Sequence, residues 1–148
     1  MHSHYASLGL NLAVSAVIMY FVMFAMIDGV GDFYHNLNMF YMALMMVAPM
    51  AVLMIVMMGS MYSDRRLNWI ISVGFAVVFA LASLGIRSQA AIGDLQFVRS
   101  MIPHHSGAIL MCREASISDA ELRRLCDEIS AGQRAEIQQM ERILARLQ

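Results

Sequence analysis

The chain has 148 residues, of which 59% are hydrophobic and 14% are charged. A soluble domain is typically about 45 to 50% apolar and about 25% charged, so this composition argues against a purely soluble protein. The ten basic residues are all arginine and stand against eleven acids, which gives a net charge of −1. This balance excludes a nucleic-acid-binding protein held by basic charge.

Three uncharged stretches are long enough to cross a membrane. They run from Leu8 to Ile27, from Met39 to Met61 and from Leu67 to Ile86, and a bilayer core needs about 20 apolar residues in a helix. The first has no basic segment before it and is too long for a signal peptide, so we interpret it as a retained anchor. We therefore predict a membrane domain over residues 1–87 and a separate segment over residues 88–148.

Charge in the connections predicts the orientation of these spans. Arg65 and Arg66 lie in the connection between the second and third spans, whereas the connection 28–38 carries only acids. Short basic loops stay in the cytoplasm. We expect the N-terminus and the Arg65–Arg66 loop inside, and the connection 28–38 and the C-terminal segment outside, with Arg87 as a small counterweight.

The C-terminal segment predicts an antiparallel helical hairpin. Ser118 and Glu121 form a capping box for a helix that begins at Asp119, and apolar residues then recur at helical spacing. A preceding helix is expected over residues 93–115. Because two helices bury too little surface to fold alone, the hairpin should pair with a second copy, dock on a partner or pack against the spans.

Methionine is concentrated in the first two spans. Thirteen of the sixteen methionines precede residue 62, and a stripe at three- or four-residue spacing follows the second span: Met39, Met42, Met46, Met50, Met54, Met57 and Met61. Methionine serves as flexible apolar filler in helix interfaces, but a thioether is also a soft, neutral ligand suited to Cu(I). The third span has no methionine. Both interpretations stay open.

The connection between the first two spans contains Asp28, Asp32 and His35, and Met39 follows it. These side chains could collect a cation at the outer mouth of the spans. A solvated loop is the simpler interpretation.

The sharpest local pattern is Met101-Ile102-Pro103-His104-His105. On a helix, Met101 precedes His104 by three residues and His105 by four, so its sulfur can approach either imidazole. Pro103 has no N–H for the Arg99 carbonyl, which loosens this turn. The same side of the helix continues to Met111 and Cys112. A metal site is the hypothesis that this pattern favours.

The run Asp94-x-x-Phe97-x-x-x-Met101-Ile102-Pro103-His104-His105-x-x-Ala108-x-x-Met111 resembles the signature of the domain-of-unknown-function family 305, and Gln133-x-x-Glu136-Ile137-x-x-Met140 resembles its second conserved helix. Members of that family have a ferritin-like helical fold and include periplasmic copper-binding proteins. The spans resemble its membrane-anchored branch. The resemblance implies copper ligands at Met101, His104, His105 and Met111, with Asp94 and Met140 as supplements, in a hairpin on the periplasmic side of a bacterial inner membrane. A full family domain has four soluble helices, whereas this chain supplies two.

Cys112 and Cys126 flank the expected hairpin turn. We expect both to be buried as small apolar residues. A disulfide between them is the less favoured alternative, and Cys112 could also join a Cu(I) site beside His105.

The leading hypothesis is a membrane-anchored, all-α protein that captures Cu(I) for copper tolerance or for delivery to a cuproenzyme. The alternative is a structural or assembly subunit of a membrane protein complex, in which methionine only packs. An enzyme is not expected, because a di-iron oxidase needs Glu-x-x-His pairs and none occurs here. Expected partners are the lipid bilayer and a second copy or a membrane complex, with no nucleic acid.

Overall fold

The structure is a computed structural model that describes residues 2–148, with side chains from residue 4 onward. Throughout that range the chain forms α-helices and short 3₁₀ turns, with no strand. It divides into two compact units. One contains Asn38–Ala91 and the chain up to Met23, and the other contains Phe24–Leu37 and Ile92–Gln148.

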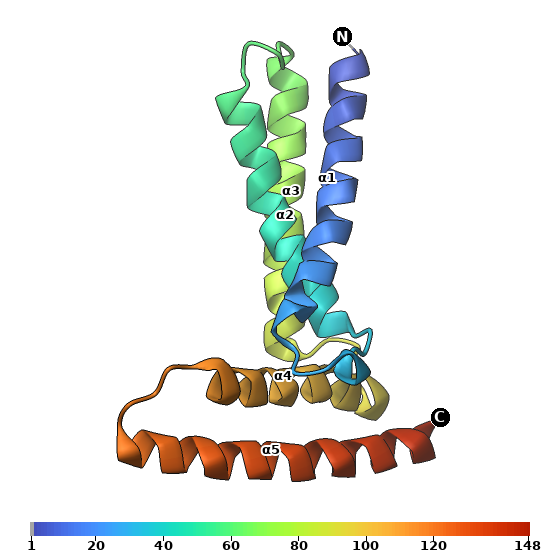
Figure 1. Cartoon of the computed structure of the whole chain (residues 1–148). Coiled ribbons are helices and arrows are strands. Elements are labelled where there is room, and N and C mark those ends of the chain that lie inside the picture. Colours follow the sequence, from blue (N-terminus) through green and yellow to red (C-terminus); the bar gives the residue numbers. More distant parts are fainter. Residues whose placement is uncertain (1) are drawn as a thin grey trace. The chain divides into compact units, whose positions relative to one another are not determined.

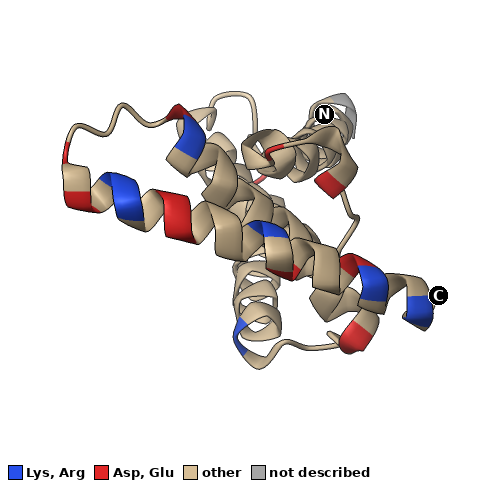
Figure 2. Cartoon of the chain, turned by 60° about the horizontal axis from the view of Figure 1, so that its bottom comes forward, with Lys and Arg blue, Asp and Glu red and all other residues tan. Residues whose placement is uncertain are grey.

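The first unit consists of three long apolar helices: α1 (His2–Val22), α2 (Leu37–Met57) and α3 (Arg65–Ser88). They run alternately in opposite directions (Figure 1). Each is long and apolar enough to cross a membrane, α1 with its continuation to Met26. Of the charged residues, these helices carry only arginine, at the ends of α3. Most of the blue and red segments in Figure 2 belong to the rest of the chain. The all-α class and the three membrane-competent helices are confirmed.

Three helix ends differ from those that the sequence predicts. α2 ends at Met57 rather than Met61, because the chain turns at Met58–Met61 around Gly59. α1 gives way to a 3₁₀ turn, η1 (Met23–Met26), before the expected end at Ile27. α3 begins earlier, at Arg65, where the Asp64 carboxylate caps the Leu67 N–H at 3.0 Å.

A core cluster joins the helices of this unit. It contains Leu8 and Leu12 from α1, three α2 residues and Tyr62, with Ile71 and Phe75 of α3 packed against it. Polar contacts reinforce its ends. The Tyr5 hydroxyl donates to Oδ1 of Asn68 at 2.8 Å, and the Tyr41 hydroxyl donates to the Ala90 carbonyl at 2.9 Å.

The second unit is built on a hairpin of two helices, α4 (Asp94–Glu114) and α5 (Ala120–Leu147). They lie side by side in opposite directions (Figure 1). Their shared core contains Val98, Ile102 and Ile109 of α4 and Ile137 and Leu144 of α5, of which Ile102 is completely buried. The two expected helices are therefore confirmed.

The expected capping box is wrong by one residue. Asp119, not Ser118, is the N-cap of α5, and its carboxylate accepts from the Leu122 N–H at 2.8 Å. An aspartate offers the same local acceptor as a serine, with a charge that the positive end of the helix favours. The helix consequently begins at Ala120.

The two cysteines form a disulfide, which corrects the expectation that both stay free and apolar. The five residues between α4 and α5 bring the Cα atoms of Cys112 and Cys126 to 5.3 Å, within the range that a disulfide bridges. Both residues are half-buried. The bond fixes the helices against each other at the turn end of the hairpin.

We predict that replacing both cysteines by serine lowers the free energy of unfolding of the hairpin by about 3 kcal/mol, the amount expected for closing a loop of this length. Thermal unfolding of the full chain in mild detergent, followed by circular dichroism, measures it. The wild-type chain after reduction is the matched control and should lose the same amount. Equal stability of oxidised, reduced and serine-substituted protein would show that the bond contributes nothing.

Candidate metal centre

Most of the residues expected to bind metal lie on α4, and the disulfide and the helix cores determine what they face on α5. Cys112 is bonded to Cys126. His105 lies seven residues before Cys112 on α4, and the Glu136 that it approaches lies ten residues after Cys126 on α5. The same antiparallel register, continued by one turn from His105 and Glu136, places Met140 level with Met101.

His105 points toward α5. Its side chain is 13% exposed, and its Nδ1 lies 3.0 Å from Oε2 of Glu136. The approach is off the direction of a hydrogen bond, and the buried Nδ1 atom has no hydrogen-bond partner. A buried ring nitrogen without a partner is costly, so this imidazole is free to be oriented by Glu136 or to bind another group.

His104 lies beside His105 but points away from the hairpin core. Its side chain is exposed, and the centroids of the two rings are 6.0 Å apart at an interplanar angle of 61°. Adjacent residues are about 100° apart around a helix, which accounts for the separation. One histidine therefore faces the partner helix while the next faces solvent.

Pro103 contributes to this local geometry without breaking α4. Pro103 has no N–H to donate to the Arg99 carbonyl, which accepts instead from the side-chain amide of Asn36 at 3.5 Å. Asn36 is 5% exposed and lies in the connection between α1 and α2. The proline thus frees an acceptor by which this connection is attached beside the histidines.

The six expected ligands do not converge on one point. Asp94 is the first residue of α4 and Met111 lies 17 residues later, so about 26 Å of helix separates them. Met101 and Met140 are half-buried, and Met140 packs against the hairpin core, whereas Met111 is 53% exposed. By the register of the two helices, Met101 lies level with Met140, one turn from the level of His105 and Glu136.

Glu136 is the residue at this level that the sequence-based site did not include. It lies one turn before Met140 on α5, so the same spacing argument that connects Met101 to His105 would have found it. Within residues 2–148 no group of three or more His, Cys, Asp and Glu side chains is close enough to hold a metal.

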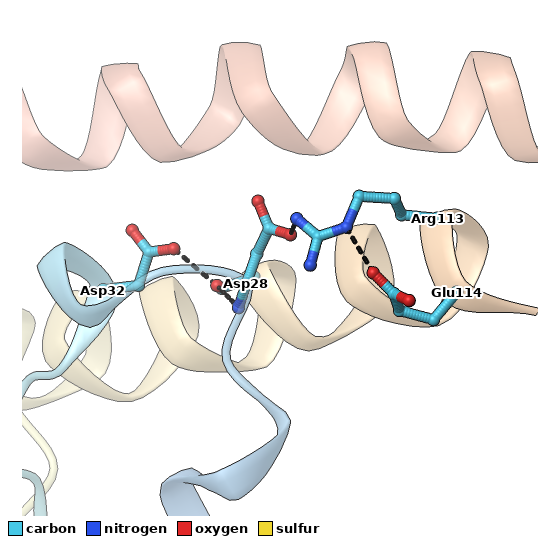
Figure 3. A network of polar contacts seen from close by, with 5 residues as sticks. Asp28, Asp32, Arg113 and Glu114 are labelled. Atoms are coloured by element: carbon cyan, nitrogen blue, oxygen red, sulfur yellow. Dashed lines mark hydrogen bonds and ion pairs between the residues drawn. The ribbon is translucent and has the colours of Figure 1, made fainter.

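The acids of the connection between α1 and α2 are already engaged by α4 (Figure 3). The buried Ser106 hydroxyl donates to Oδ2 of Asp32 at 2.5 Å and accepts from the Asp28 N–H at 2.6 Å. The Asp28 carboxylate pairs with Arg113. A Cβ at Gly107 would lie 3.2 Å from the Met26 carbonyl oxygen, so the connection also packs closely on the helix. The connection is a docked segment, not a freely solvated loop.

Arg113 joins two acids at the exposed end of this network. Its Nε donates to Oε1 of Glu114 at 2.7 Å, and its other side faces Asp28. The Glu114 hydrogen bond, with the nearby Asp28 charge, raises the pKa of Arg113 above its ordinary value. Arg113 thus stays charged at any physiological pH, and its pairs contribute little stability because the guanidinium is half exposed.

We predict that Ser106→Ala loosens the docked connection by about 1 to 3 kcal/mol, because it removes two hydrogen bonds from a completely buried hydroxyl. Hydrogen exchange of the full chain in detergent should show about 5- to 150-fold faster exchange at the Asp28 amide. Ser100→Ala is the matched control, since the Ser100 hydroxyl bonds only to the Phe97 carbonyl of its own helix. Unchanged exchange at Asp28 would contradict the docking role of Ser106.

Two comparisons with known proteins bear on this geometry. The family model described as Domain of unknown function (DUF305) matches residues 83–148, which include all of α4 and α5. An uncharacterized protein of Acanthamoeba polyphaga mimivirus is 35% identical over 119 residues, covering 79% of this chain and 76% of the relative. No solved structure matches the chain significantly. The chain belongs to the DUF305 family.

Proposed function

We propose that this chain is a membrane-anchored copper-binding protein that captures Cu(I) for copper tolerance or for delivery to a cuproenzyme. The observation that supports it best is the position of His105, one turn after Met101 on α4, with its buried Nδ1 atom 3.0 Å from Oε2 of Glu136, which lies one turn before Met140 on α5. Thioether sulfur and neutral imidazole are the ligands that suit Cu(I). An apolar two-helix core around them favours a soft, weakly charged ion over a hard one.

Each of these residues has a distinct role in the proposal. The sulfurs of Met101 and Met140 approach from opposite helices, and His105 binds through Nε2 while Glu136 accepts from its Nδ1–H. A carboxylate in that position fixes the ring tautomer and raises ligand basicity. The exposed His104 receives the ion from solvent. Asp94 and Met111 lie too far along α4 to bind the same ion within one chain.

The proposed location is a bacterial inner membrane, with the N-terminus in the cytoplasm and the hairpin in the periplasm. The chain between α1 and α2 and the chain after α3 form one compact unit. Two of the three proposed crossings, α2 and α3, lie between these segments, and an even number of crossings returns the chain to the same side of a membrane. The basic Arg65–Arg66 connection then lies on the cytoplasmic side.

The hairpin is proposed to complete a ferritin-like bundle with a second copy. Its outer surface retains exposed apolar side chains, among them Phe97 at 52%, Leu122 at 46% and Leu125 at 48% exposure. The same surface favours the second candidate function, a structural subunit that docks on a larger membrane protein. Metal binding separates the two candidates.

We predict that changing His104 and His105 together to alanine weakens Cu(I) binding by about a hundredfold or more. Loss of a metal ligand should exceed the 10- to 100-fold effect that is usual for loss of a second-shell partner. A competition titration of the full chain in detergent with a chromogenic Cu(I) chelator measures the affinity. His4→Ala removes an exposed histidine of the other unit and is the matched control.

Acidification provides a second readout of the same site. Imidazole binds metal only when neutral, whereas thioethers do not protonate at moderately acid pH. Binding by the wild-type chain should therefore weaken as the pH falls, while the residual binding of the double variant should not. Equal affinity of wild type and double variant at neutral pH would refute the histidine site, and a metal-free wild type would favour the structural role.

We predict that a membrane-impermeant maleimide labels Cys112 and Cys126 on intact, mildly reduced spheroplasts, because the proposal places the hairpin outside the inner membrane. The double serine variant is the control for labelling at other sites, since the chain has no further cysteine. Labelling that requires disruption of the inner membrane would reverse the proposed orientation.

A further inference from the structure

A groove runs between α2 and α3 at the end of the three-helix unit where α3 begins. Its volume is about 520 Å³, and its apolar walls come from Val52, Ile55 and Val56 of α2 and from Trp69 of α3. Ile55 is 5% exposed and belongs to the core of the unit, whereas Val56 and Trp69 are 71% and 73% exposed. The groove therefore has a packed floor and open rims, and on helices that cross a membrane such a surface faces lipid.

Arg65 is the charged residue in the lining of this groove. It is the first residue of α3, its side chain is exposed, and no acid among residues 4–148 lies within ion-pair distance of it. The carboxylate of the preceding Asp64 is directed instead to the Leu67 N–H. Asn68, also in the lining, is satisfied within the unit, because its Oδ1 accepts from the Tyr5 hydroxyl and its amide donates to a backbone carbonyl, each at 2.8 Å. The Arg65 guanidinium is thus a positive charge without a protein anion.

A second groove, of about 410 Å³, adjoins the first along the same two helices. It shares Val52 and Val56 with the first groove, extends to Phe79 of α3 and has no charged residue in its lining. From Arg65 to Phe79, α3 rises about 21 Å. The hydrocarbon depth of one leaflet is about 15 Å, which is half of the bilayer core. The two grooves together are therefore long enough for one acyl chain, with the positive charge at one end.

We propose that these grooves bind an anionic phospholipid, with its phosphate at Arg65 and one acyl chain along α2 and α3. A guanidinium offers planar donors that match the geometry of phosphate. Trp69 lies four residues after Arg65, about 6 Å along the helix, and tryptophan rings are enriched at the headgroup level of a membrane. The proposed orientation places this end at the cytoplasmic leaflet, whose anionic lipids attract arginine. The inference relies on the proposed membrane crossing of α2 and α3, but not on copper.

Trp69 is the single tryptophan of the chain, so its fluorescence reports on the groove directly. Bromine atoms on an acyl chain quench a tryptophan that they contact. The measurement uses the full chain in phosphatidylcholine vesicles that contain a small fraction of phosphatidylglycerol, with one lipid or the other brominated. Quenching should show that phosphatidylglycerol binds about fivefold more strongly than phosphatidylcholine, the advantage expected from one arginine beside an anionic lipid.

The neighbouring arginine provides a matched control. Arg65→Gln should abolish the preference for phosphatidylglycerol. Arg66→Gln removes the same charge from the next residue, which does not line the groove, and should retain most of the preference. Equal loss in the two variants would show that a diffuse surface charge attracts the lipid, and would overturn the site. The comparison of the two lipids in the wild-type chain needs no variant, and equal quenching by both would also overturn it.

The copper proposal and this inference fail separately. A Cu(I) chelator in every sample removes copper from the measurement, and the preference for phosphatidylglycerol should remain. A chain that binds the lipid but no copper would support the lipid site and contradict the proposed copper function. Absence of quenching by either brominated lipid would show that Trp69 does not contact acyl chains, and would overturn both the lipid site and the membrane crossing of α3.

Discussion

The register of α4 against α5 determines the chemistry available in the second unit. Two helices alone could slide or rotate with little cost, because their core is small: Ile102 is the one large apolar side chain in it that is completely buried. The disulfide at the turn end removes that freedom. With the register fixed, His105 meets Glu136 and Met101 lies level with Met140. A shift by one turn would separate all four side chains.

The connection between α1 and α2 adds a second constraint on the same helix. It is attached to α4 through Asn36 at Arg99, Asp32 at Ser106 and Asp28 at Arg113. These positions lie on both sides of His104 and His105 along α4. α4 is therefore packed against α5 on one side and against this connection on another. The histidine turn thus lies between attachments of the connection at Arg99 and at Ser106.

Much of this fold could be predicted from sequence, because apolar length and helical periodicity are local properties. The three apolar helices and the hairpin follow from them, and errors in the ends come from turn chemistry, as with Gly59 after α2 and Asp119 before α5. Relations between distant residues were harder to predict. The disulfide and the pairing of His105 with Glu136 depend on the helix register, which no local pattern fixes, and the docking of Asp28 and Asp32 depends on the buried hydroxyl of Ser106.

The two units differ in what it costs to place histidine beside methionine. In the hairpin, His104 is exposed, so water can satisfy its ring nitrogens, and His105 has Glu136 beside it. Inside an apolar three-helix unit, an imidazole would need a buried partner to avoid an unsatisfied polar group, whereas a thioether needs none. The sequence follows this difference in cost: Met101 stands beside histidines, whereas Met19, Met50 and Met54 pack against a core cluster that contains no histidine.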